Sequence, residues 1–311
     1  MPDSCLACGS LQARPRFASV DRLYGVVPDT FQVVQCSTCG LERLAPRPAA
    51  SELARLYPRD YWFDPSESAA SHLAETYRRF VLRDHVRFVL RVWQDARSSR
   101  PLLDVGCGGG LLPGMLREHS VPALGLDFSA SACHLASTLH GVPCIAGNLD
   151  DCPVRPGSLG VVTMFHVLEH VPNPARYLRT AHDLLAPGGR LVVQVPNRDS
   201  LQARLFGARW NGYDVPRHLT DFRASDLVRF MRAAGFRVRH EKHFSWRDNP
   251  AGFATSLAPS LDPMARRIRH RPTGWLHLAS YFSLVLAAVP FALFEAAIGR
   301  GSSIMVEAVK E

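Results

Sequence analysis

From residue 101 onward, short apolar runs alternate with longer stretches whose apolar residues recur at helical spacing. This alternation predicts βαβ units and a mostly parallel sheet. A Pro-Gly-Gly turn at 187–189 precedes one of the expected strands, and a glycine ends the helix expected at 224–235. The tail alternates as a strand does. The first expected strand begins at Leu102, and the others cover 123–127, 143–146, 159–165, 190–195, 236–244 and 304–309.

The segment 46–98 has a helical pattern ahead of the sheet. Leu53, Leu56 and Tyr57 lie on one face of a first helical stretch. The apolar positions between 77 and 93 predict one amphipathic helix, although its period is imperfect. We interpret this segment as a lid or a packing helix.

Residues 245–300 interrupt the sheet pattern with a basic run and an apolar stretch. Residues 276–294 carry no formal charge, and this length permits a membrane span. If 304–309 returns to the sheet, both ends of the interruption lie on one side of a bilayer, which excludes a single crossing. The alternatives are an interfacial helix around Pro290, and an apolar helical pair that covers the sheet or forms a dimer contact. Anionic headgroups would attract the basic run, which comprises Arg266, Arg267, Arg269 and Arg271.

The chain of 311 residues has room for one large domain and a smaller one, and its formal net charge is +8. Lysine occurs only at Lys242 and Lys310. We interpret the excess of arginine as a coding bias, and without an arginine run interleaved with aromatic residues we expect no nucleic-acid binding. The start, MPDSCLACGS, has no secretory pattern, so we expect a cytoplasmic protein. Reduced thiols fit the cysteines that show no framework spacing, which are Cys107, Cys133, Cys144 and Cys152.

Four cysteines near the start form two C-x-x-C-G pairs. They are Cys5 and Cys8, followed by Gly9, and Cys36 and Cys39, followed by Gly40. Four thiolates can close a tetrahedral zinc site, and each glycine lets backbone amides point at the sulfurs. A redox motif would need a single pair beside a βαβ unit. The sequence therefore predicts a structural zinc ribbon, whose metal has no open position for catalysis.

The glycine-rich stretch 102–112, LLDVGCGGGLL, combines a buried strand with a tight turn into a helix. Glycines let the backbone approach a ligand, and the start of the helix offers free N–H groups. Gly106, Gly108 and Gly110 follow a G-x-G-x-G pattern, whereas a dinucleotide fingerprint would need glycine in place of Leu111. The stretch DVGCGGG resembles the first motif of class I S-adenosylmethionine-dependent methyltransferases.

This resemblance implies where the cofactor would bind. Asp127, at the end of the second strand, would accept both ribose hydroxyls, and an N-cap for the next helix is its alternative role. The turn at 147–150 would face the adenine, although Asn148 stands where the family usually has an acid. Gly160 is a second departure from the family pattern. The expected cofactor-binding residues are Asp104, Gly106, Cys107, Gly108, Gly110, Asp127, Phe128, Asn148 and Leu149.

Two stretches supply catalytic candidates. The segment 166–170, HVLEH, resembles the segment after the fourth strand of methyltransferases that act on small molecules and glycans, and some relatives bind a divalent metal there. It also matches H-x-x-E-H of zinc peptidases, but that motif needs a helix, whereas this one follows a strand. The loop 210–222 is where the family places acceptor contacts. His218 is its expected general base, and His166 is the second candidate. Structural hydrogen bonding is the alternative to metal binding.

Taken together, these patterns predict an α/β protein with a Rossmann-like, seven-stranded methyltransferase sheet. A zinc ribbon precedes the sheet, and an apolar helical insert precedes its last strand. Tyr61 or Trp62 closing over the cofactor is a further hypothesis. The expected units are 1–48 (zinc ribbon), 49–98 (helical lid or linker), 99–244 (cofactor domain), 245–300 (insert) and 301–311 (final strand).

The expected activity is transfer of a methyl group from S-adenosyl-L-methionine to a small-molecule, glycan or lipid-linked acceptor, with a hydroxyl as the favoured nucleophile. The insert favours a peripheral position on the anionic inner face of a membrane, and a homodimer is its alternative use. One competing function is a nicotinamide-dependent dehydrogenase, which Leu111 disfavours. The other is a non-catalytic docking module.

Overall fold

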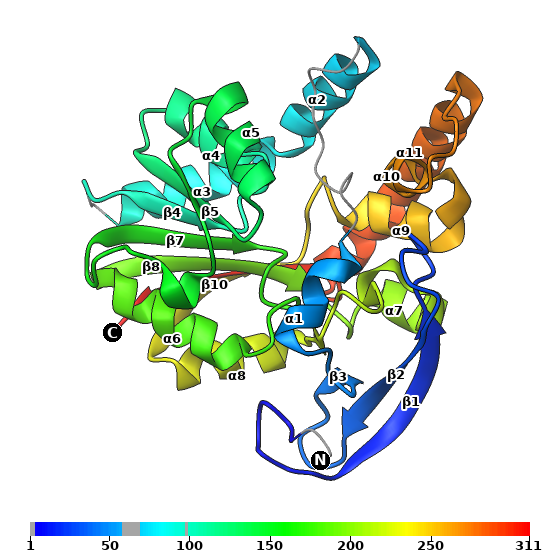
Figure 1. The fold of residues 1–311 in the computed structure, drawn as a ribbon, viewed down its shortest axis with the longest axis horizontal. Coiled ribbons are helices and arrows are strands. Elements are labelled where there is room, and N and C mark those ends of the chain that lie inside the picture. The colour runs from blue at the N-terminus through cyan, green and yellow to red at the C-terminus, as the bar shows by residue number, and fades with distance from the viewer. Residues whose placement is uncertain (1–3, 58–68, 97–98) are drawn as a thin grey trace.

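The computed structural model describes residues 4–57, 69–96 and 99–311, which contain two sheets (Figure 1). The larger sheet has seven strands in the order β10-β11-β8-β7-β4-β5-β6. Its strands are β4 (Leu102–Val105), β5 (Ala123–Asp127), β6 (Cys144–Ala146), β7 (Leu159–Phe165), β8 (Leu185–Pro196), β10 (Phe236–Lys242) and β11 (Ser303–Lys310). Every strand expected from the apolar runs is present, which confirms the predicted fold class.

The five strands β4 to β8 pair in parallel, and β11 pairs antiparallel with both β8 and β10. Parallel strands covered on both faces carry continuous apolar runs, and β7 is buried at every position. The carboxyl ends of such strands share one edge, where open α/β sheets bind their ligands. The predicted return of the tail to the sheet is confirmed.

The strand β8 is longer than expected. The sequence predicts a turn at 187–189, but these residues lie within the strand. The pairing with β7 shifts between Leu159, opposite Leu185, and Val161, opposite Arg190. The intervening residues therefore form an irregularity in a paired strand, and Gly188 takes a positive φ of 74° there. The predicted placement of the turn before the strand is wrong.

Helices cover both faces of the larger sheet (Figure 1). They are α3 (Arg83–Asp95), α4 (Leu111–Glu118), α5 (Ala130–His140), α6 (Pro174–Leu184) and α8 (Ala224–Ala233). Successive strand residues point to opposite faces. Accordingly, Leu102 packs with residues of α3 and α4, whereas Leu103 packs with residues of α6 and α8. The core therefore lies in two layers around the sheet.

Two helices take the place of the single helix expected at 77–93. They are α2 (Ala69–Val81) and α3, and Leu82 lies between them. α3 buries its apolar stripe against the sheet, whereas α2 projects beyond it (Figure 1). On α2, Tyr77 packs edge-on against Phe282, with ring centroids 5.0 Å apart. α3 therefore packs on the sheet, whereas α2 contacts α11 (Trp275–Ala297). One helical period cannot describe both helices, and the single-helix prediction is wrong.

The smaller sheet is antiparallel, in the order β1-β2-β3-β9. Its strands are β1 (Ala13–Val20), β2 (Thr30–Cys36), β3 (Glu42–Ala45) and β9 (Thr220–Asp221). The last of these comes from the loop that follows β8. Two segments far apart in the sequence therefore share this sheet, which lies at the lower right of Figure 1.

Short helices occupy the connections between the strands. They are α1 (Ala50–Leu53), η1 (Ala54–Leu56), η4 (Leu149–Asp151), α7 (Leu201–Phe206), η5 (Gly207–Arg209) and η6 (Asn211–Tyr213). The last three lead from β8 to β9, so they position the loop in which His218 lies.

The insert between β10 and β11 is helical. It contains α9 (Asn249–Leu257), η7 (Pro259–Leu261), α10 (Pro263–Ile268) and α11 (Trp275–Ala297). α11 packs against α9, and its first turns project away from both sheets (Figure 1). α10 instead packs on the connection between β1 and β2, where Ala265 and Ile268 contact Tyr24. Within the described part of the chain, α11 is the one helix long and apolar enough to cross a membrane, and 22% of its apolar window is buried. Both ends of the insert join strands of one sheet, which excludes a single crossing.

Candidate active site

A glycine-rich loop joins β4 to α4 at the carboxyl edge of the larger sheet. Its glycines at 106, 108 and 110 have positive φ angles of 69°, 55° and 80°, which glycine adopts without steric cost. A Cβ on Gly106 would lie 2.5 Å from the Val167 side chain, and one on Gly110 would lie 2.6 Å from Ala136. The loop therefore packs closely against both neighbouring segments, and the predicted strand, turn and helix are present.

Asp127 ends β5 and holds this loop. Its Oδ2 accepts a hydrogen bond from the Gly108 amide and its Oδ1 accepts one from the Ser129 amide, both at 2.9 Å. The next helix is capped by Ser129, whose side chain accepts from the Ala132 amide, so Asp127 is not its N-cap. Each carboxylate oxygen retains a second lone pair. Two acceptor positions therefore remain for a ligand.

Asp104 is buried at the end of β4, beneath the loop. The Thr163 hydroxyl donates to its Oδ1 at 2.6 Å. Burial raises the pKa of Asp104 to about 7, the Thr163 hydrogen bond lowers it, and the charge of Asp127 raises it. Burial also raises the pKa of Asp127. Because buried carboxylates are stabilised by positive charge and by hydrogen-bond donors, these two carboxyls favour a ligand that carries a positive charge and hydroxyl groups.

The other predicted cofactor residues follow the ends of β4, β5 and β6. Phe128 is 49% exposed. Asn148 is exposed, and its Oδ1 accepts from the Tyr177 hydroxyl at 3.5 Å. Leu149 is fully buried in the core and supports the turn that carries Asn148. Cys107 turns toward the neighbouring strand, with its Sγ 3.4 Å from that of Cys144.

The turn after β7 holds His166 between two carboxylates. Its Nδ1 lies 3.1 Å from Glu169 Oε1 and its Nε2 lies 3.3 Å from Asp248 Oδ1. Burial lowers the pKa of His166, but the two carboxylates outweigh burial and raise it to about 9. The imidazole is therefore cationic at neutral pH and has no lone pair with which to accept a proton.

Glu169 is buried at the centre of the same turn. Its Oε2 has no hydrogen-bond partner among the residues that the structure describes. Burial raises the pKa of Glu169, but the hydrogen bond from His166 and the positive charge of His166 outweigh burial and lower it below its ordinary value. The site therefore contains an ionised carboxylate with one unused oxygen.

His218, the predicted base, lies beside this carboxylate. Its Nδ1 is 2.7 Å from the Gly212 carbonyl oxygen. Because a carbonyl only accepts, Nδ1 carries the proton and Nε2 keeps the lone pair of the neutral ring. Nε2 lies 4.0 Å from Glu169 Oε1. The ligand atoms of Glu169, His170 and His218 lie within 4.8 Å of one another, a set whose chemistry also suits a divalent cation.

Tyr57 contacts both His170 and Phe128, one of the predicted cofactor residues. The sequence does not indicate this role. Its hydroxyl lies 3.0 Å from His170 Nδ1, and its ring centroid lies 5.4 Å from that of Phe128. The sequence instead favours Tyr61 or Trp62 for closure over the cofactor. Both lie outside the described residues, so that hypothesis stays a prediction.

Arg217 anchors the loop that carries His218. Its Nη2 donates to Asp21 at 2.8 Å and to Asp214 at 2.6 Å. The guanidinium lies 4.4 Å from the centroid of the Tyr24 ring. Arg217 and Asp21 stand 196 positions apart, so no local pattern could have identified this buried ion pair.

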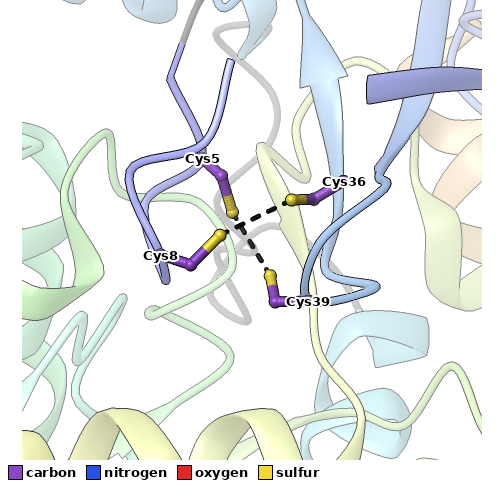
Figure 2. A group of neighbouring side chains, drawn as sticks. All are labelled: Cys5, Cys8, Cys36 and Cys39. Carbon is purple, nitrogen blue, oxygen red and sulfur yellow. Dashed lines mark hydrogen bonds between the residues drawn. The ribbon is translucent and has the colours of Figure 1, made fainter. Parts of the chain in front are cut away.

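The four N-terminal cysteines converge from two turns (Figure 2). The sulfurs of Cys5 and Cys39 lie 3.5 Å apart, and those of Cys8 and Cys36 lie 3.6 Å apart. Ligands at about 2.3 Å from a tetrahedral zinc ion would lie about 3.8 Å from one another. Burial raises the pKa of Cys36, but backbone amides and neighbouring thiols outweigh burial and lower it to about 6. The group therefore has the composition and spacing of a closed zinc site.

Residues 73–241 match the methyltransferase domain family. They make up more than half of the chain and include the glycine loop, Asp127, the turn after β7 and His218. The chain belongs to this family. It is an S-adenosylmethionine-dependent methyltransferase with the class I fold.

Named relatives agree with this assignment. The methyltransferase is 33% identical, over 167 residues, to the ubiquinone biosynthesis O-methyltransferase of Pseudomonas paraeruginosa. The aligned region covers 48% of this chain and 72% of that protein. It is 31% identical, over 182 residues, to the protein of that name from Burkholderia thailandensis, covering 53% and 77%. A solved S-adenosylmethionine-dependent methyltransferase from Archaeoglobus fulgidus aligns with a TM-score of 0.50 and 15% identity, over 78% of this chain and 100% of that one. This last likeness shows the fold alone.

Membership in the methyltransferase family sets aside the dehydrogenase interpretation of the glycine loop. The matched span contains the proposed cofactor and acceptor sites of the methyltransferase. It leaves out the four cysteines and the insert, so neither takes its role from the family match.

Proposed function

We propose that this methyltransferase moves a methyl group from S-adenosylmethionine to a hydroxyl of a small-molecule, glycan or lipid-linked acceptor. The observation that carries the proposal is the orientation of His218. The Gly212 carbonyl holds its Nδ1, and its Nε2 faces the buried carboxylate of Glu169. An imidazole with one directed lone pair is suited to accept a hydroxyl proton. The relatives' name, O-methyltransferase, supports an oxygen acceptor.

The proposed cofactor site follows the ends of β4, β5 and β6. Asp127 would accept the ribose hydroxyls with the lone pairs that the loop amides leave unused. The glycine loop would admit the amino-acid end of the cofactor close to the backbone, and Phe128 with Asn148 would contact the adenine. When bound, S-adenosylmethionine supplies an electrophilic methyl group that a nucleophile attacks in line.

Proton transfer would use His218 and Glu169. The acceptor hydroxyl would give its proton to Nε2 of His218 as its oxygen forms the new bond to carbon. The Glu169 carboxylate, 4.0 Å away, would stabilise the resulting imidazolium. His166 would be a positioning residue, because its positive charge keeps Glu169 ionised.

A structural zinc ion at the four cysteines belongs to the same proposal. The donor set would leave the metal no open coordination position, so the ion would stabilise the smaller sheet without taking part in the reaction.

We place acceptor delivery at a membrane surface. Large apolar side chains that a folded protein usually buries are exposed on α11 and just after it, and exposed apolar groups of this extent mark interaction surfaces. They are Trp275, Leu276, Leu286, Leu293, Phe294 and Ile298. The basic run contributes less than the sequence suggests. Arg266 is buried, and Arg269 donates to the Leu23 carbonyl, whereas Arg271 is exposed.

The test is transfer of labelled methyl groups into a host extract that is then split into lipid and aqueous fractions. We expect label in the lipid fraction, and His218→Ala should slow the transfer by about 10²- to 10⁴-fold. The exposed His119 serves as the control, because His119→Ala should leave the transfer unchanged. Absence of label with the donor shown to bind would contradict the proposed transfer, and transfer unaffected by His218→Ala would contradict the assignment of the base.

Leu286→Glu tests the membrane contact separately. Leu286 is 71% exposed on α11 and lies outside the proposed site. The variant should lose label from the lipid fraction and lose flotation on anionic vesicles while still binding S-adenosylhomocysteine. Label confined to the aqueous fraction of the wild type would assign the insert to packing or to a dimer contact.

A further inference from the structure

Three cysteines that the proposed mechanism does not use gather beside the glycine loop. Cys107 lies between two glycines of the loop, Cys144 begins β6 and Cys133 lies on α5. The sulfurs of Cys107 and Cys144 are 3.4 Å apart. Cys133 lies 3.3 Å from the Ile145 carbonyl oxygen and also hydrogen-bonds to Cys144. Cys107 and Cys144 therefore form a pair with a third thiol close by.

Gly125 of β5 makes room for this pair. It lies opposite Cys144 in the sheet, and a Cβ at this position would stand 2.6 Å from the Cys107 sulfur and 3.0 Å from the Cys144 sulfur. The two side chains thus meet over the one position of β5 that has no side chain. Both cysteines are partly exposed, so a small solute has access.

We propose that Cys107 and Cys144 form a peroxide-sensitive dithiol whose oxidation to a disulfide releases the cofactor. This inference rests on the proposed function, because it requires the glycine loop to bind S-adenosylmethionine. A hydroperoxide is the oxidant, and the two thiols with one hydrogen peroxide give one disulfide and two waters.

The two sulfurs have different roles in this reaction. Hydrogen bonds from Cys107, the larger effect, and from Cys133 lower the pKa of Cys144 to about 7, although burial raises it, so a thiolate is available at neutral pH. That thiolate attacks the peroxide O–O bond, forming a sulfenic acid and releasing hydroxide, which takes up a proton to become water. The Cys107 sulfur, whose own pKa is raised, then attacks the sulfenic sulfur and displaces a second water.

Bridging would displace the cofactor loop. A disulfide is about 2.05 Å long, so the sulfurs must approach from 3.4 Å. Cys107 has little freedom, because its amide and that of Gly106 both donate to the Leu126 carbonyl. The next amide, of Gly108, donates to Asp127. Displacement of Cys107 toward β6 therefore disturbs the amide that positions the proposed ribose-binding carboxylate.

The experiment treats the full-length, zinc-loaded protein with hydrogen peroxide and maps its disulfides by mass spectrometry without reduction. Trypsin leaves Cys107 in the peptide 98–117 and the other three central cysteines in 118–176. We expect these two peptides to be cross-linked. The dissociation constant for S-adenosylhomocysteine, measured by calorimetry, should rise at least about tenfold and return to its first value with dithiothreitol.

Three variants identify the partner. Cys144→Ser should abolish the cross-link and the effect of peroxide on affinity, whereas Cys133→Ser and the matched control Cys152→Ser should retain both. A bridge that persists in Cys144→Ser, a bridge within 118–176, or a bridge that leaves affinity unchanged would each overturn the proposal. Failure of the reduced wild type to bind S-adenosylhomocysteine would instead refute the proposed cofactor site, and the disulfide map would still show whether the bridge forms.

Discussion

Two histidines of one turn carry different charges because of their partners. The carboxylates beside His166 raise its pKa to about 9, whereas burial and the charge of His218 lower the pKa of His170 to about 4. At neutral pH the first is a cation and the second is neutral. In the sequence the two are equivalent members of HVLEH. The difference in charge comes partly from Asp248, which lies beside His166. Asp248 is the N-cap residue of α9 in the insert, so the sequence could not show that it lies beside His166.

The charge of His166 should make stability depend on pH. Its pKa in the folded protein, about 9, exceeds the ordinary value of 6.5. The stabilisation is therefore complete below pH 6.5 and is lost as the pH rises through 9, and it amounts to at most about 3 kcal/mol. His166→Asn removes the charge and tolerates the positive φ of this position. In urea unfolding, the difference between the wild type and this variant should shrink as the pH rises, and a constant difference would contradict the prediction.

Among the elements, the connection between β4 and α4 packs closely against α5 at Gly110. A Cβ on Gly110 would meet both the Cβ and the Cα of Ala136. A side chain can give way by rotating, but Cα cannot. Gly110 is therefore required for packing as well as for its backbone conformation.

Gly110→Ala should destabilise the protein by about 2 to 4 kcal/mol, because it adds overpacking to the strain of a positive φ. Gly141→Ala is the matched control, since Gly141 has a φ of 61° at the end of α5 and a Cβ there would meet nothing within 4 Å. That variant should cost about 1 kcal/mol. Equal losses in chemical unfolding would show that strain alone determines the effect.

The strands were largely predictable from the sequence, because buried parallel strands carry continuous apolar runs bounded by turn residues. The bounds of β5 and β7 coincide with those expected. β9 has two residues and owes its existence to its pairing with β3, so no local pattern marks it. The site divides in the same way. The glycine loop, Asp127 and the cysteine pairs are local motifs, whereas Tyr57 and Arg217 act through distant partners.

At the scale of the whole molecule, β9 connects the cysteine-bearing sheet to the turn after β7. Thr220 and Asp221 pair with Arg43 and Glu42 of β3. The amides of Leu219 and Thr220 donate to the Glu169 carbonyl, at 2.8 and 3.2 Å. The division of the chain at residue 48 stays a prediction. The smaller sheet begins before residue 48, but its last strand, β9, comes from the segment expected to form the cofactor domain.

Loss of the proposed zinc ion should therefore loosen the active-site loop. Cys36→Ser removes one ligand at the end of β2 and should reduce the zinc content measured by mass spectrometry from about one equivalent. Amide hydrogen exchange at 219–221 should then become faster, because β2 pairs with β3 and β3 with β9. Cys152→Ser should alter neither quantity. Zinc loss with unchanged exchange at 219–221 would contradict the predicted coupling.

The position of β11 has a consequence for folding during synthesis. It lies between β8 and β10, yet the ribosome completes both neighbours, and then α11, before β11 emerges. Until that moment, β8 and β10 present unpaired backbone groups to any chain or chaperone nearby. Pairing of the last strand with both neighbours then closes the sheet and fixes the end of α11 that leads into it.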